Sequence, residues 1–88
     1  MTDKRREVRS FTTGEVHVKF TDPEMFEIDG TLLDVSASGF RMSHDCRSLR
    51  SGQLVEFAHV QAKGRAQVMW NRIQTGGVES GFLIVSRA

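Results

Sequence analysis

Two short polar clusters in this chain have the residue types and spacing that binding of an anion or a nucleotide base requires. The first contains Arg5 and Arg9, four positions apart in the basic segment 4–9. In an extended chain an even step places both side chains on the same side. A guanidinium can bind a phosphate with two parallel hydrogen bonds, bind guanine O6 and N7, or stack on a base. The alternative is a solvated basic tail, or an arm that pairs with Asp3, Glu7 or the body of the protein.

The second cluster spans residues 34–39 and has the pattern Asp-x-Ser-x-x-Gly. The Asp34 carboxylate could accept hydrogen bonds from the N–H groups on the Watson–Crick edge of guanine. Ser36 would add a short hydrogen bond, and Gly39 would allow the backbone to approach the base. The alternative is a capped turn, in which the Asp and Ser side chains bond nearby backbone N–H groups and Gly39 supplies a positive φ angle.

The length and charge of the chain limit the size of the domain and the class of ligand that these clusters can bind. Eighty-eight residues, 39% hydrophobic and 26% charged, predict one small globular domain. A net charge of +1 argues against a general nucleic-acid binder, and a basic arm on a near-neutral body favours a small anionic ligand. The longest apolar runs are too short to span a bilayer, so we expect no membrane insertion. The single cysteine, Cys46, cannot form an internal disulfide, and we expect a cytoplasmic protein.

The elements that must position the clusters are short strands, because period-two alternation dominates the sequence. In the segment Glu15–Phe20, for example, Val16, Val18 and Phe20 alternate with polar residues. The sequence predicts a mainly all-β fold, a six-stranded antiparallel barrel over residues 13–88, preceded by a flexible basic arm over residues 1–12. The expected strands are Glu15–Phe20, Thr31–Leu33, Phe40–Met42, Leu54–Val60, Gly64–Ile73 and Gly81–Val85. The expected turns include Asp29-Gly30, the break at Asp34–Gly39, Lys63-Gly64 and Gly76-Gly77.

No catalytic or metal-binding constellation emerges from the remaining residues. His44, Asp45 and Cys46 are adjacent, so an extended chain cannot bring all three to one metal ion, and we interpret them as a polar loop. Nothing in the sequence places a base beside Cys46, as a nucleophilic cysteine would require. We therefore predict no enzyme activity, no metal and no cofactor.

Taken together, the two clusters and the strands between them resemble the PilZ domain, a bacterial receptor for cyclic di-GMP. Arg-x-x-x-Arg followed about 25 residues later by Asp-x-Ser-x-x-Gly is the signature of that family. The segments 40–42, 52–57, 66–70 and 81–82 are similar to the family's usual strands. The resemblance extends from Arg5 to about Val85.

The resemblance implies a role for each cluster. Arg5 and Arg9 would wrap the phosphates of cyclic di-GMP and stack on a guanine, while Asp34, Ser36 and Gly39 would hold a guanine on the barrel face. A further set of residues is assigned with less support: Lys4, Arg6, Arg41 and Trp70.

Three members of that second set leave alternatives open. Trp70 matches a position from which some family members contact the ligand, and its alternative is packing in the barrel wall with Ala66 and Val68. Arg41 either contacts a ligand phosphate or supports the residues that do, and its alternative is a solvated position on the outer face of its strand. A basic residue at the position of Lys4 accompanies binding of two stacked ligand molecules in this family, so the ligand number stays open.

The resemblance implies a non-catalytic receptor that passes its signal to a protein partner, with no nucleic acid bound. Neither the partner nor the oligomeric state follows from the sequence. Two alternatives stay open at this point. One is an interaction module with the same fold that does not bind the ligand. The other is a small barrel that binds single-stranded nucleic acid, although such proteins usually display several exposed aromatic residues on one sheet face.

Overall fold

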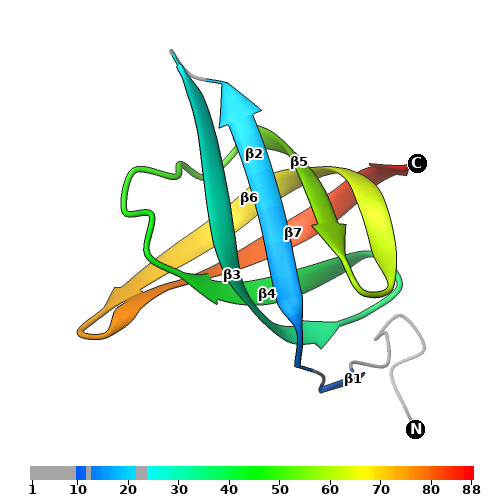
Figure 1. Cartoon of the computed structure of the whole chain (residues 1–88), viewed down its shortest axis with the longest axis horizontal. Coiled ribbons are helices and arrows are strands. Elements are labelled where there is room, and N and C mark those ends of the chain that lie inside the picture. Colours follow the sequence, from blue (N-terminus) through cyan, green and yellow to red (C-terminus); the bar gives the residue numbers. More distant parts are fainter. Residues whose placement is uncertain (1–9, 12, 22–23) are drawn as a thin grey trace, which may run out of the picture.

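The computed structural model of the chain describes residues 10–11, 13–21 and 24–88. Within these residues one antiparallel sheet closes into a barrel (Figure 1). The strands are β1 (Ser10–Phe11), β2 (Glu15–Thr21), β3 (Met25–Val35), β4 (Gly39–His44), β5 (Leu54–His59), β6 (Ala62–Gln74) and β7 (Gly77–Arg87). The strand order is β1-β3-β2-β5-β6-β7-β4, and the pairing of β3 with β4 closes the ring. In the described part of the chain the predicted barrel of six strands is therefore confirmed, with the two-residue β1 added beside β3.

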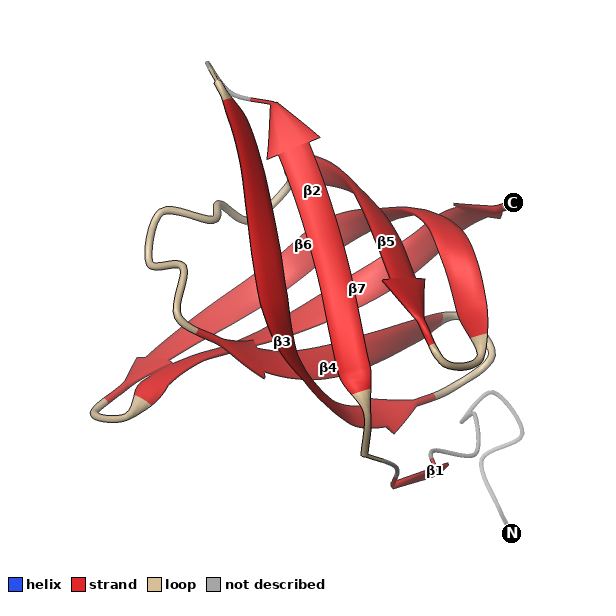
Figure 2. Cartoon of the chain, viewed as in Figure 1, coloured by secondary structure: helices blue, strands red, loops and turns tan. Residues whose placement is uncertain are grey.

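The barrel consists of two consecutive three-stranded meanders. Strands β2, β3 and β4 pair in chain order, and so do β5, β6 and β7. The loop between β4 and β5 connects the two meanders (Figure 2). Two long-range pairings then join them, β2 with β5 and β4 with β7. We call the second of these pairings the β4–β7 seam, because the residues discussed below lie on both sides of it.

Alternating side chains fill the interior. Val16, Val18 and Phe20 of β2 are buried, which confirms the alternation predicted for this strand. On β4 the side chains of Phe40 and Met42 are buried, so Arg41 between them faces outward. The core is completed by aliphatic and aromatic residues of β3, β5, β6 and β7 and by one loop residue: Ile28, Leu32, Val35, Leu49, Val55, Phe57, Ala66, Val68 and Phe82.

The predicted turn at Asp29-Gly30 is wrong, because both residues lie inside the long strand β3. Asp29 is paired with His17 across β2 and β3, and its carboxylate lies 2.6 Å from His17 Nδ1. A Cβ atom at Gly30 would overlap the backbone of Ser43 on β4. The glycine at this position therefore allows β3 and β4 to approach closely and does not mark a turn.

The turn predicted at Lys63-Gly64 is also wrong. Both residues belong to β6, and the chain reverses at Val60 and Gln61. A Cβ at Gly64 would overlap the carbonyl of Ser86 on β7, so this glycine too marks a close approach of two strands. The described residues contain no helix (Figure 2). Consequently none of them forms a helix that could cross a membrane.

Candidate functional site

Residues from four strands form one row across the outer face of the barrel. Asp34 of β3 pairs with Arg41 of β4, Arg41 pairs with Gly81 of β7, and Gly81 pairs with Trp70 of β6. Arg41 faces outward, and the interaction of Asp34 with Arg41 places the carboxylate on the same side. The row Asp34–Arg41–Gly81–Trp70, which we call the outer row, crosses the β4–β7 seam.

A β-bulge precedes each end of the outer row. On β3 the register shifts between Leu32 and Asp34, and on β6 it shifts between Val68 and Trp70. Leu32 and Val68 are buried in the core, so a regular strand would also point the residue two positions later inward. A bulge adds a residue to one strand and thereby re-aims the side chains that follow it. The outward direction of Asp34 and of Trp70, the two ends of the outer row, thus depends on an irregularity in the sheet.

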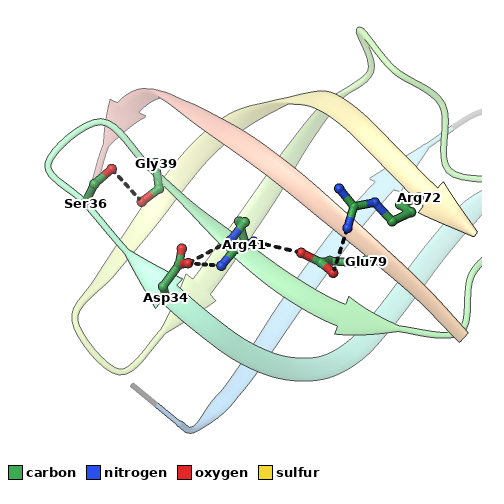
Figure 3. Close-up of polar contacts among 6 residues, drawn as sticks. All are labelled: Asp34, Ser36, Gly39, Arg41, Arg72 and Glu79. Atoms are coloured by element: carbon green, nitrogen blue, oxygen red, sulfur yellow. Dashed lines mark hydrogen bonds and ion pairs between the residues drawn. The ribbon is translucent and has the colours of Figure 1, made fainter. Parts of the chain in front are cut away.

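The Arg41 guanidinium joins two carboxylates (Figure 3). Its Nε donates to Asp34 Oδ2 at 2.7 Å, and Nη2 contacts the same oxygen. Its Nη1 donates to Glu79 Oε2 at 2.9 Å, across the β4–β7 seam. The hydrogen bond with Asp34, followed by the charges of both carboxylates, raises the pKa of Arg41, although partial burial opposes this shift.

The Asp34 carboxylate is enclosed. Its side chain is 1% exposed, compared with 33% for Arg41 and 15% for Glu79. From the sequence we expected this carboxylate to face an approaching base. In the structure Asp34 does lie on the outer face, but Arg41 covers one of its oxygen atoms. A base that bound here would share the carboxylate with Arg41 or displace the guanidinium.

Trp70 lies at the other end of the outer row, and it is half-buried. Ala66 and Val68 enter the core, whereas Trp70 lies outside the core cluster. A Cβ atom at Gly81 would overlap the indole, which shows that Trp70 lies directly over the Gly81 backbone. The guanidinium of Arg72 lies 5.7 Å from the centre of the Trp70 ring, within the range of a cation–π contact.

The hairpin between β3 and β4 carries the rest of the second cluster. The strand break expected over Asp34–Gly39 is shorter than predicted, because β3 continues to Val35 and β4 begins at Gly39. The Ser36 N–H donates to the carbonyl of Gly39 at 2.9 Å, and the Ser36 hydroxyl points to the same oxygen at 3.4 Å (Figure 3). This backbone bond closes a tight three-residue turn.

A glycine is required at position 39 for a reason other than the positive φ angle considered above. Its φ is not positive. A Cβ atom at Gly39 would instead overlap the carbonyl oxygen of Phe82 on β7. Because the backbones of β4 and β7 approach so closely here, Gly39 is needed for the seam to form. The same hairpin is bound from β7 by Ile84 N–H to Ser38 O at 2.7 Å and by Arg87 to Ala37 O at 2.6 Å.

The first cluster lies outside the described residues. This holds for Lys4, Arg5, Arg6 and Arg9, so the structure does not test their assignment. Strand β1 begins at Ser10, next in sequence to Arg9, and its residues pair with Val35 and Asp34 of β3. The described chain therefore starts beside the second cluster.

Glu79 and Arg72 are members of the site that the sequence did not indicate. Glu79 accepts from Arg41, and its other oxygen lies 4.0 Å from Arg72 Nη1. Glu79 faces Ser43 on β4 and Arg72 on β6. The outward alternation of Arg41 gave no such signal, because an arginine on the outer face can be solvated and needs no carboxylate beside it.

His44 corrects another expectation, because it is buried at the end of β4 and does not lie in a polar loop. Its Nδ1 accepts from the Cys46 N–H at 3.0 Å, so Nε2 carries the proton and donates to Ser80 Oγ at 2.7 Å. Ser80 donates to Asn71, which in turn donates to the carbonyl of Leu49 at 2.9 Å. Burial lowers the pKa of His44. Among the described residues no group of three potential ligands could hold a metal ion.

Comparison with known proteins gives a match among the solved structures. No family model matches the chain, and no curated protein matches it. The solved structure of the Bacillus subtilis inhibitor of motility (MotI/DgrA) is similar to it, with a TM-score of 0.75 over 99% of this chain and 18% sequence identity. The chain spans 45% of the length of that protein. The likeness confirms the architecture, a closed six-stranded PilZ-like barrel.

Proposed function

We propose that this chain is a PilZ domain that binds cyclic di-GMP and passes the signal to a protein partner without catalysis. One observation carries the proposal. The pairing of β1 with β3 at Asp34 and Val35 brings the chain that follows Arg9 to the second cluster. We therefore assign both motifs, which are about 25 residues apart in sequence, to one ligand site. The closed architecture shared with MotI/DgrA supports the same assignment.

The proposed ligand has two guanines and two phosphates, and the residues divide between them. Arg5 and Arg9 would bind the phosphates and stack on one base, with Lys4 and Arg6 adding positive charge. Asp34, Ser36 and Gly39 would hold a guanine against the β3–β4 hairpin. Arg41 and Trp70 lie along the outer row from that hairpin, where an indole face offers a further stacking surface.

The enclosed state of Asp34 determines how a guanine would be accepted. An ionised carboxylate has two oxygen atoms and can accept several hydrogen bonds. Arg41 binds Oδ2, so guanine N–H donors would bind the carboxylate after Arg41 has shifted toward Glu79. Glu79 already binds Arg41 and could keep that charge neutralised during such a shift.

We propose a protein partner without naming it, and we propose no pathway and no oligomeric state. The similar protein is described as an inhibitor of motility, and this chain corresponds to less than half of it. We therefore propose only that a protein receives the signal, in the bacterial cytoplasm. The single-stranded nucleic-acid alternative has less support, because Phe26 is the single exposed aromatic residue among those whose side-chain exposure is described.

Isothermal titration with cyclic di-GMP tests the proposal and reports the stoichiometry at the same time. We expect micromolar binding, with one or two ligands per chain. Because a charge-assisted hydrogen bond contributes roughly 1.5–3 kcal/mol, Arg9→Ala and Asp34→Asn should each weaken binding by about 10- to 100-fold. Arg50→Ala is the matched control, since Arg50 lies in the exposed loop between β4 and β5.

Three results would contradict the proposal. The first is the absence of binding by the wild type, which would favour the interaction module. The second is equal affinity of the wild type, Arg9→Ala and Asp34→Asn. The third is tighter binding of a single-stranded oligonucleotide than of cyclic di-GMP. Circular dichroism of each variant separates lost binding from lost folding.

A further inference from the structure

A groove of about 440 Å³ lies on the barrel, and none of the residues that line it belongs to the outer row. Residues of β2, β5, β6 and the end of β7 line it. Its cationic side chains are Lys19, Lys63, Arg65 and Arg87, and the acidic side chain among its lining residues is Glu56. Positive charge therefore predominates in the groove, although the whole chain has a net charge of only +1.

Most of this positive charge is not neutralised within the described part of the chain. There, neither Lys63 nor Arg65 forms an ion pair. Lys19 lies 3.9 Å from Glu56, and both side chains are exposed, so that pair is weak. Arg87 donates to a neutral carbonyl, that of Ala37. The groove thus offers cations that can bind an external anion without first breaking a strong internal pair.

The spacing of the cations favours an extended peptide over a single small anion. Lys63 and Arg65 are exposed and two positions apart on β6, so they lie on one face of that strand, about 6.6 Å apart along it. Alternate side chains of an extended partner strand have the same spacing. A segment with acidic residues at every second position would therefore present one carboxylate to each cation.

We propose that this groove is a docking surface for an extended acidic segment of a partner protein. The inference does not depend on cyclic di-GMP, because the charges and the groove are present without any ligand. It identifies the chemistry of a partner that the proposed receptor function leaves open. Arg87 adds a physical connection, because it both lines the groove and binds the β3–β4 hairpin at Ala37.

Fluorescence anisotropy with a defined peptide tests the proposal. The probe is a fluorescein-labelled peptide of four Glu-Ser repeats, with a Gln-Ser analogue as the neutral control, and no nucleotide is added. The double variant Lys63→Glu with Arg65→Glu should weaken peptide binding by about tenfold, because two ion pairs are replaced by two like-charge contacts. Higher salt should weaken binding by the wild type as well.

The matched control reverses the same number of charges elsewhere. Arg47 and Arg50 are exposed in the loop between β4 and β5, so Arg47→Glu with Arg50→Glu has the same net charge as the groove variant. We expect it to change peptide affinity less than about twofold, the effect of distant screened charges. Equal weakening by the two double variants would overturn the proposal, because binding would then depend on net charge alone.

Two further results would also overturn the proposal. One is equal binding of the Glu-Ser and Gln-Ser peptides by the wild type. The other is loss of binding in the double variant Arg5→Gln with Arg9→Gln but not in the groove variant, which would assign the peptide to the basic N-terminal segment. Amide chemical-shift changes at residues 63–65 and 86–87 on adding the peptide would support the groove directly. Because this titration contains no nucleotide, its failure is distinct from a failure to bind cyclic di-GMP.

Discussion

Asp34 on β3 and Trp70 on β6 occupy the two ends of one cross-strand row, although β4 and β7 lie between them. Each follows a buried core residue by two positions, and each is turned outward by a bulge at that point. The acidic and aromatic groups of the candidate site therefore share a face because of two separate departures from regular pairing. Bulges are common beside functional sites for this reason.

Removing the Arg41 side chain should destabilise the barrel. Arg41→Ala deprives two poorly exposed carboxylates, Asp34 and Glu79, of their shared cation. We expect a loss of about 2 kcal/mol in the free energy of unfolding, less than the roughly 3–5 kcal/mol for a fully buried pair because Arg41 is partly exposed. Urea unfolding measures this loss. In Arg72→Ala the change should be below about 0.5 kcal/mol, and equal losses in the two variants would contradict the central role of Arg41.

Trp70 should report ligand binding directly, because it is the sole tryptophan of the chain. If cyclic di-GMP extends along the outer row, a base near the indole will change its emission on titration. Trp70→Ala should weaken binding by about tenfold, whereas Trp70→Phe keeps an aromatic face and should weaken it less. Unchanged tryptophan emission at a ligand concentration that saturates the calorimetric signal would place the ligand away from Trp70.

Gly39→Ala should disrupt the β4–β7 seam. The added methyl would overlap the Phe82 carbonyl, and neither backbone can move without breaking strand pairing. We expect a loss of about 2 kcal/mol or more in the free energy of unfolding, typical of overpacking. Gly76→Ala is the matched control, because a Cβ there has open space. If thermal unfolding shifted equally in both variants, the close approach at Gly39 would not be the cause.

Stability should fall as the solution is acidified below about pH 6.5, the pKa of an unperturbed histidine. Burial lowers the pKa of His44, so the unfolded chain binds a proton at a higher pH than the folded protein does. The contribution of neutral His44 is therefore present above the unfolded pKa and is lost as the pH decreases through the folded pKa. Burial also lowers the pKa of His59, which acts in the same direction.

Urea unfolding at pH 7.5 and pH 5.0 measures this dependence. In His44→Gln the difference between the two pH values should be smaller than in the wild type, since one titrating group is gone and the rest remain. An identical difference in the two proteins would show that protonation of His44 is not linked to folding.

Arg87 should couple the groove to the hairpin. Its hydrogen bond to Ala37 O joins the proposed peptide surface to the turn that would hold a guanine. If both proposals hold, saturating cyclic di-GMP should change the Kd of the Glu-Ser peptide by about threefold or more, and the peptide should change the Kd of the nucleotide by the same factor. Arg87→Gln should reduce that factor toward one. Undiminished coupling in Arg87→Gln would exclude this contact as the connection.

The general architecture could be predicted from the sequence, because alternation on β2 and β4 reflects burial on one face only. The predicted turns at Asp29-Gly30 and Lys63-Gly64 failed for a shared physical reason. Each glycine allows a neighbouring strand to approach closely, at Ser43 and at Ser86 respectively. A single sequence does not distinguish this use of glycine from its use in a turn.

The candidate site was predictable only in part. Asp34, Ser36 and Gly39 lie within six consecutive positions, so their pattern could be recognised in the sequence. The second partner of Arg41, Glu79, could not be recognised, because register across the β4–β7 seam depends on long-range pairing. The bulge before Trp70 has no local signal either, since Val68 and Trp70 have the spacing of an unbroken buried strand.

The meander arrangement also has a consequence for how fast the protein unfolds. The contact between Arg41 and Glu79 crosses the β4–β7 seam, where the paired residues are about 40 positions apart in sequence. Such pairings require closure of a long loop, so we expect them to form after the local hairpins, close to or beyond the folding transition state. Interactions that form that late mainly slow unfolding and hardly accelerate folding. A ligand bound along the outer row would therefore lengthen the lifetime of the native state, acting as a kinetic clamp on the closed barrel.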